Sequence, residues 1–324
     1  MTTGNDLRDL HGLPTFAFHV PEETAGPFDP SGSPAPDAVA WRIGTEGHDR
    51  WRWEDLFARF LDTVDTTRVR ALIVGSWGTP SQAGPQEAIE TLVAARGRLP
   101  ALRRLFLGEF DHEVSEISWT QQGDVTPLLE AFGELEDFGV RGGDGLRIGP
   151  LRHERLRRLK AETGGMSAET VRGVAASDLP ALEHLDLWLG TPEYGGDAEV
   201  SDLAPLLDGT RLPALKYLAL RNSEMQDDIC AALAAAPVVA RLDVLDVSMG
   251  VLTDDGATAL LTGQPLTHLK ALDMHHNYLS DAIRARLHDA LEPAGVQVNT
   301  DPDGAEDDED EEDGEVWRYV AVGE

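Results

Sequence analysis

A nine-residue string occurs three times with few changes, as LPALRRLFL at residues 99–107, LPALEHLDL at 179–187 and LPALKYLAL at 212–220. Counted from its fourth residue, each copy has leucine at positions 1, 4 and 6. With other apolar residues allowed, the same frame starts at residues 69, 102, 135, 156, 182, 215, 242 and 269, at intervals of 21 to 33 residues. One unit of this size cannot bury its own leucines, so the repeat predicts units that stack on their neighbours.

Positions 4 and 6 of the frame are two residues apart, so their side chains point to the same face of a β-strand. The segments that follow the frames have helical patterns. Ile89, Leu92 and Val93 share one helix face, and Ser201 and Ser280 are suited to cap later helices. A strand that alternates with a helix in this way predicts parallel strands joined by helical connections, which is an α/β fold.

This pattern resembles that of the leucine-rich repeat proteins, in particular their long-repeat, ribonuclease-inhibitor-like class, and is similar to that of uncharacterised bacterial members. Residues 242–260 match that class best, because Leu252, Gly256 and Leu260 have the spacing that it uses after its strand. Asn277 takes position 9 of the last clear repeat. In this family, the asparagine at that position is expected to bond the loop backbone.

The match has two departures. Position 9 holds Ser223 and Gly250 in the two preceding repeats, and the unit at residues 135–155 is short for a full helix. The resemblance implies a leucine-rich-repeat solenoid, or horseshoe, of about eight repeats over residues 67–300. Its strands would form a parallel sheet on the concave side, with the helices on the convex side and a small N-terminal α+β cap.

Residues 1–66 have a different pattern and are predicted to form the N-terminal cap that a solenoid needs over its apolar end. A separate small functional domain is the alternative to a cap for residues 1–66. Residues 15–20 and 39–43 are predicted as short strands. An amphipathic helix should follow, with an apolar face formed by Trp53, Leu56, Phe57, Phe60, Leu61 and Val64.

Residues 301–315 contain 11 carboxylates, eight of them consecutive at residues 306–313. Like charges repel at this density, so we expect a disordered, solvated segment. A weak cation site or an attraction for a basic partner is the alternative. Residues 316–324 alternate apolar and polar side chains and include Trp317 and Tyr319, which predicts a last strand that docks on the body.

The net charge is −31, from 27 basic and 58 acidic residues. This balance argues against sequence-independent binding to nucleic acid and against docking on an anionic membrane, since both depend on clustered Lys and Arg. The single cysteine, Cys230, excludes an intrachain disulfide and a cysteine-rich zinc module. The first residues lack the basic and apolar regions of a secretion signal, and the apolar residues 231–240 are about half a membrane span, so we expect a cytoplasmic protein.

Positions 3, 5 and 7 of the frame should point out of the concave sheet, where the core does not need them. Position 5 places Asp186, Asp246 and Asp273 in one lateral row, interrupted by Ala219. Trp, Tyr and Arg often anchor protein interfaces, and an acidic row suits a partner with a basic or mixed-charge surface. A solvated strand face without a partner is the alternative. The predicted partner-binding residues are His184, Asp186, Trp188, Tyr217, Arg221, Asp246, Asp273 and His275.

We therefore predict a non-catalytic scaffold that binds a protein partner on its concave face and needs no cofactor. An accessory subunit of an enzyme complex fits the same features. A remote alternative is a hydrolase in which Asp246 and Asp273, about 5 Å apart on adjacent strands, act as the paired carboxylates of a retaining glycosidase. A metal site at His184, His275 and His276 is not predicted, because adjacent residues of a strand point to opposite faces.

The unit that starts at Leu102 contains an extra segment, residues 109–122. We expect Val114, Ile117 and Trp119 to pack against the edge of the sheet. The segment is then either a functional loop or a longer structural connection, since loops between repeats tolerate insertions.

Overall fold

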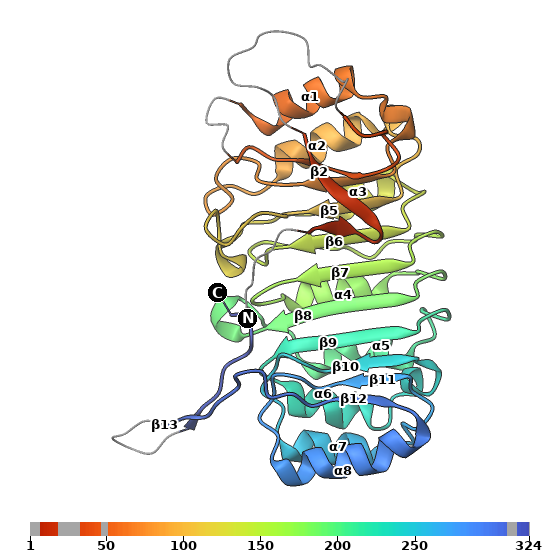
Figure 1. The fold of residues 1–324 in the computed structure, drawn as a ribbon, viewed down its shortest axis with the longest axis vertical. Helices are drawn as coiled ribbons and strands as arrows, with labels where there is room; N and C mark the ends of the chain where they lie inside the picture. Colours follow the sequence, from red (N-terminus) through yellow and green to blue (C-terminus); the bar gives the residue numbers. More distant parts are fainter. Residues whose placement is uncertain (1–6, 19–32, 47–50, 310–315, 324) are drawn as a thin grey trace.

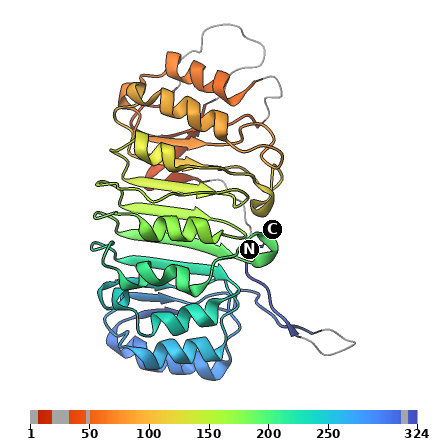
Figure 2. The same cartoon turned by 180° about the vertical axis from the view of Figure 1, so that it is seen from behind.

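The computed structural model describes residues 7–18, 33–46, 51–309 and 316–323. In this part of the chain, twelve strands form one sheet in the order of the sequence, from β1 to β12. Each neighbouring pair from β2 to β12 is parallel, and β1 forms an antiparallel hairpin with β2. Helices cover one face of this sheet, and we call the opposite face the concave face (Figures 1 and 2). The predicted α/β leucine-rich-repeat solenoid is confirmed.

The elements have the following bounds. The strands of the sheet are β1 (Asp9–Leu10), β2 (Leu13–Ala17), β3 (Ala40–Ile43), β4 (Ala71–Val74), β5 (Arg104–Leu107), β6 (Asp137–Arg141), β7 (Arg158–Glu162), β8 (His184–Gly190), β9 (Tyr217–Ser223), β10 (Val244–Asp246), β11 (Ala271–Asp273) and β12 (Gln297–Asn299). The α-helices are α1 (Trp53–Thr63), α2 (Gln86–Ala94), α3 (Thr126–Ala131), α4 (Ala168–Ala176), α5 (Ala204–Asp208), α6 (Gln226–Leu233), α7 (Asp254–Gly263) and α8 (Asp281–Leu291). None of the helices in the described residues is long and apolar enough to cross a membrane.

The frame read from the sequence sets the register of the sheet. Each of the eight frames has the first residue of a strand, β4 to β11, at its position 3. Position 4 of one frame lies beside position 4 of the next, from Leu72 beside Leu105 to Leu245 beside Leu272. The spacing of the leucines therefore predicted both the strands and their pairing.

The apolar side chains of the frame form the core between the sheet and the helices. Positions 1, 4 and 6 are at most 4% exposed in every frame. Asn277, at position 9, is buried below them: its Oδ1 accepts from Leu252 N at 3.0 Å, and its Nδ2 donates to Val247 O and Met274 O, each at 3.0 Å. The loop-bonding role expected for this asparagine is confirmed.

Additional strands continue the sheet beyond the eight frames. At one end, Ala40 of β3 pairs with Ala71, and β3 and α1 repeat the strand–helix unit. Helix α1 buries the predicted apolar face, with Trp53, Leu56, Phe57 and Phe60 at 0% exposure. At the other end, β12 pairs with β11. The strand predicted at residues 15–20 overlaps β2 at residues 15–17, and residues 19 and 20 of the prediction lie outside the described residues.

The last part of the chain differs from the simple expectation of a disordered segment followed by a docked strand. Strand β13 (Asp308–Glu309) lies within the predicted acidic segment and pairs with β14 (Val316–Trp317) in a separate antiparallel ribbon (Figure 1). Residues 310–315 lie outside the described residues. The residues after β14 return to the body and lie along one edge of the sheet.

Candidate partner-binding site on the concave face

Position 5 of successive strands forms one line of side chains across the concave face. The register places Lys160 beside Asp186, Asp186 beside Ala219, and Ala219 beside Asp246. Asp246 in turn lies beside Asp273. The predicted acidic row is therefore present, with a small apolar residue in its middle and a lysine at one end.

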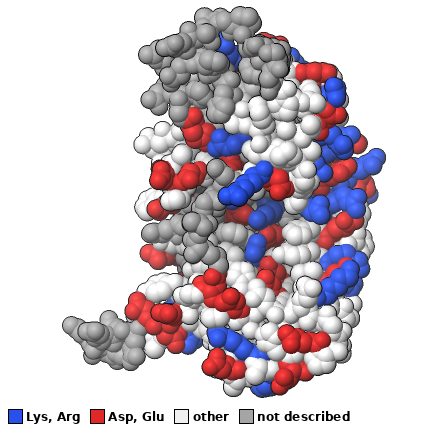
Figure 3. All heavy atoms as spheres, viewed as in Figure 1, with Lys and Arg blue, Asp and Glu red and all other residues white. Residues whose placement is uncertain are grey.

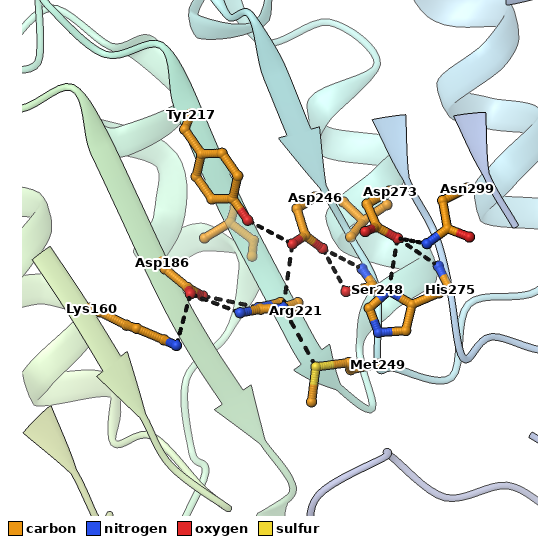
Figure 4. Close-up of polar contacts among 12 residues, drawn as sticks. Lys160, Asp186, Tyr217, Arg221, Asp246, Ser248, Met249, Asp273, His275 and Asn299 are labelled. Atoms are coloured by element: carbon orange, nitrogen blue, oxygen red, sulfur yellow. Dashed lines mark hydrogen bonds and ion pairs between the residues drawn. The ribbon is translucent and has the colours of Figure 1, made fainter. Parts of the chain in front are cut away.

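Arg221, two residues after Ala219 on β9, connects the two parts of the row (Figure 4). Its Nε and Nη2 donate to the two carboxylate oxygens of Asp186, at 3.0 and 2.8 Å, and its Nη1 lies 3.4 Å from Asp246 Oδ2. Burial disfavours the charged guanidinium, but Asp186 and Asp246 outweigh this effect and raise the pKa of Arg221. One arginine thus neutralises carboxylates from two strands through charge-assisted contacts.

Asp246 has a partner for each of its oxygens. Its Oδ2 accepts from the hydroxyl of Tyr217 at 2.8 Å. Its Oδ1 accepts from the backbone N and the Oγ of Ser248, at 3.1 and 2.6 Å. Burial and the charge of Asp246 raise the pKa of Tyr217, so its phenol keeps its proton and donates a hydrogen bond to the carboxylate.

Asp273 and His275 form a second polar pair at the other end of the row. Oδ1 of Asp273 lies 2.8 Å from His275 Nδ1, and it also accepts from His275 N at 3.0 Å and from Asn299 Nδ2 at 3.1 Å. Burial opposes ionisation of Asp273, but the hydrogen bonds from His275 outweigh it, so the pKa of Asp273 lies below its ordinary value. The same hydrogen bond raises the pKa of His275.

The network extends to a buried carboxylate that the sequence reasoning did not select. Glu162, at position 7 of its frame, is 3% exposed and pairs with Arg141 Nε at 2.6 Å and with Lys160 Nζ. Burial raises the pKa of Glu162, but the two cations have the larger, opposite effect and bring this pKa down to about 2. Lys160 Nζ also lies 3.8 Å from Asp186 Oδ2, so ion pairs connect Arg141 to Asp246 without a break. The signal in the sequence was the alternation of charges at positions 5 and 7.

Aromatic side chains complete the predicted set. Trp188 lies between two cations, with Lys160 Nζ at 5.6 Å and Arg221 Cζ at 5.2 Å from its ring, which are cation–π distances. The ring of His184 stacks on that of Tyr217. Burial lowers the pKa of His184 to about 4, so this histidine is neutral at pH 7.

The structure brings all eight predicted binding residues together, but not as free side chains. Seven of them belong to β8–β11, and His275 is the second residue after β11. None of the eight is fully exposed. Asp186 and Asp246 are only 2% and 3% exposed, so the expectation of an accessible carboxylate row is wrong for these two residues. Parallel strands about 4.8 Å apart bring neighbouring outward side chains into contact. Arg221 therefore pairs with both carboxylates, and Tyr217 bonds Asp246.

The N-terminal half of the concave face is covered by the chain itself. Leu10, at the end of the β1 strand, packs on Ile73 and Phe106, which stand at position 5 of their strands, and these three residues are at most 4% exposed. Nε2 of His11 lies 2.9 Å from Asp137 Oδ2 and adds a polar contact. No periodicity in residues 7–17 predicted that this hairpin would lie over the sheet. The face left open by the described residues is therefore its C-terminal half.

The extra segment at residues 109–122 packs less completely than expected. Ile117 is buried, but Val114 is 36% and Trp119 is 61% exposed, so their predicted packing on the sheet edge is wrong. The segment is held instead by polar groups. Buried Glu109 pairs with Arg42, and Gln122 Nε2 donates to Arg141 O at 2.6 Å. These anchors fix the backbone and leave Trp119 pointing to solvent.

Within the described residues, no group of three or more His, Cys, Asp or Glu side chains could hold a metal ion. His184 lies on β8, whereas His275 and His276 follow β11, so the three histidines considered above do not converge. Cys230 is fully buried, and burial raises the pKa of its thiol.

No family model matches this chain. The chain is 32% identical over 208 residues to the monocyte differentiation antigen CD14 of Bos taurus, in an alignment that covers 62% of this chain. That alignment covers 51% of CD14, so the chain spans about half the length of this relative.

Among solved structures, a Bacteroides fragilis protein has a TM-score of 0.75 and 27% identity, over 87% of this chain and 77% of that chain. A TLR13–ssRNA13 complex has a TM-score of 0.38 and 13% identity, over 82% of this chain and 33% of that chain. The repeat frame and the parallel sheet, in which strands alternate with helices, together show that the chain has a leucine-rich-repeat fold.

Proposed function

We propose that this protein is a non-catalytic scaffold that binds a partner protein on the C-terminal half of its concave face. The site, which we call the concave patch, consists of the eight residues His184, Asp186, Trp188, Tyr217, Arg221, Asp246, Asp273 and His275. One observation carries the proposal: six of these side chains form one connected network across β8, β9 and β10, and Asp273 and His275 form a separate bonded pair on the strand beside it. A partner would meet groups that are already fixed, so little side-chain entropy is lost on binding.

The charges of the patch favour a partner that carries both signs. Carboxylates alternate with Arg221 and with His275, whose raised pKa favours its protonated form. Over the described part of this face, acidic and basic side chains are interspersed, without a large area of one sign (Figure 3). Complementary charge placement mainly provides specificity and orientation, which suits the selection of one partner surface.

The geometry gives no support to the hydrolase alternative. A retaining glycosidase needs one carboxyl group whose raised pKa allows it to donate a proton. The pKa of Asp273 is instead lowered, and Asp246 is buried and bonded to Tyr217, Ser248 and Arg221. An accessory role in an enzyme complex would use the same surface and would be recognised by the identity of the partner.

The test is affinity capture from native cell extract with a patch variant and a matched control. Trp188→Ala combined with His275→Ala removes two half-buried groups and leaves the buried ion pairs of Arg221 intact. Arg286→Ala combined with Asp289→Ala changes two exposed residues of α8, on the helical side. We expect a partner that the wild-type and control proteins capture and the folded patch variant loses. Equal capture by all three proteins would contradict the proposal.

A further inference from the structure

The segment Arg318–Gly323 lies along the edge of the sheet at which the strands end. It leaves the β13–β14 ribbon, passes Tyr278 and Met249, and reaches Asn222 (Figure 1). The segment thus runs across three successive repeats, in the direction opposite to the order of the strands. Ser118, in the extra segment at residues 109–122, contacts its far end.

The edge holds this segment by its main chain. The hydroxyl of Tyr278 donates to Tyr319 O at 3.0 Å and accepts from Tyr319 N at 2.9 Å. Ala321 N donates to Met249 O at 2.9 Å. The amide of Asn222 donates from Nδ2 to Val322 O at 2.7 Å and accepts at Oδ1 from Val322 N at 2.9 Å.

Two further contacts complete the recognition. Ser118 Oγ donates to Gly323 O, and a Cβ at Gly164 would lie only 2.6 Å from that same oxygen. Glycine at position 164 therefore leaves the room that the segment occupies. Val320 is 8% exposed, whereas Tyr319 is 57% exposed, so one apolar side chain enters the body and its neighbour does not.

The position and conformation of Asn222 suit this contact. It stands just where β9 ends, with a left-handed φ of 53°, and it is fully buried. Both hydrogen-bonding groups of its amide face Val322, in the way that a paired strand would present its own N–H and C=O. The contacts with Val322 satisfy this buried amide, and burying its donor and acceptor without partners would destabilise the fold.

We propose that this edge, which we call the edge site and define by Ser118, Asn222, Met249 and Tyr278, is a binding site for an extended peptide of another protein. The site recognises main-chain groups along the peptide and one buried apolar side chain at the place of Val320. Residues 319–323 occupy it as a tethered ligand, at the high effective concentration of an intramolecular segment. The edge site shares no residue with the concave patch, so either proposal can fail alone.

The test uses the full chain and a labelled peptide with the sequence of residues 317–323. Ala321→Pro removes the N–H that donates a hydrogen bond to Met249 O, and it should release the tethered segment. Hydrogen exchange at the amides of Tyr319 and Val322 would report this release. We expect the peptide to bind this variant at least tenfold more tightly than the wild type, as measured by fluorescence anisotropy. Asn222→Gly in addition should weaken binding at least tenfold, because glycine tolerates the left-handed backbone and removes only the amide.

The matched control is His276→Gly in the same Ala321→Pro background. His276 stands at the same place of the repeat two strands away, with φ of 47°, and its ring lies near Asp303 rather than the segment. Binding should be retained with this control. Four results would each overturn the proposal. In hydrogen exchange, they are rapid exchange of the segment's amides in the wild type, or the same protection of these amides in Ala321→Pro. In the binding assay, they are equal peptide affinity for the wild type and Ala321→Pro, or equal loss of affinity with Asn222→Gly and His276→Gly.

Discussion

The ring of His184 stacks on the ring of Tyr217 across β8 and β9, with centroids 3.8 Å apart and an angle of 11° between the planes. The burial that this stack provides lowers the pKa of His184 to about 4. An unfolded histidine titrates near pH 6.5, so between these two values the unfolded state binds more protons than the folded state. Stability should therefore fall as the pH decreases from about 6.5 towards 4.

The first prediction concerns this pH dependence. His184→Phe keeps a stacked ring and removes the titrating group, so the variant should lose less stability than the wild type between pH 7 and pH 5. The difference should be on the order of 1–2 kcal/mol. Urea melts at the two pH values measure it, and the same loss in both proteins would contradict the assignment.

The second prediction has the opposite sign. The hydrogen bond to Asp273 raises the pKa of His275, so its stabilising contribution is complete below the unfolded pKa near 6.5 and is lost as the pH rises through the folded pKa. His275→Gln should thus be most destabilising at pH 6 and much less so at pH 9. Melts of both proteins at these pH values provide the measurement, and an NMR titration of the ring should show the raised pKa directly.

The third prediction concerns the arginine between the two carboxylates. Arg221→Met would leave Asp186 and Asp246 buried without their cation, which should cost about 3–5 kcal/mol. The matched control is Arg157→Met, which breaks the exposed pair with Glu183 and should change stability by less than about 1 kcal/mol. Equal effects in denaturant melts would show that the buried network contributes no more than a surface pair.

The fourth prediction tests the frame itself. Leu218 is fully buried at position 4, so Leu218→Ala should cost about 2–5 kcal/mol through lost burial and the cavity left behind. Val316→Ala, at a position 49% exposed on β14, should stay within about 0.5 kcal/mol. A small effect at Leu218 in a denaturant melt would contradict the assigned repeat.

The sequence predicted the sheet well because its information is periodic. Leucines at positions 1, 4 and 6 specify which residues are buried, and stacking of like units then sets the register, as Leu218 beside Leu245 shows. The lateral row of Asp186, Asp246 and Asp273 follows from the same periodicity. Its burial does not, because it depends on how far Arg221 and Tyr217 reach across neighbouring strands.

Contacts between segments far apart in the sequence were not predictable in this way. Residues 7–17 contain no pattern that places Leu10 on Phe106, and the edge site holds Val322 through main-chain atoms that every residue possesses. Asn222, at position 8 of its frame, was not singled out from the sequence; only its neighbour Ser223, at position 9, was noted as a departure. A polar residue at such a strand end, with no core role, is the signal that would have pointed to the edge.

The most direct test of the scaffold proposal is oxidative footprinting of the full chain alone and with its captured partner. Hydroxyl radicals modify accessible Trp, Tyr and His side chains, and mass spectrometry locates each modification. The proposal predicts that the partner protects Trp188, Tyr217 and His275 and leaves exposed Trp119 and Trp317 unchanged. Protection confined to Trp119 and Trp317, with unchanged oxidation of the concave patch, would contradict it.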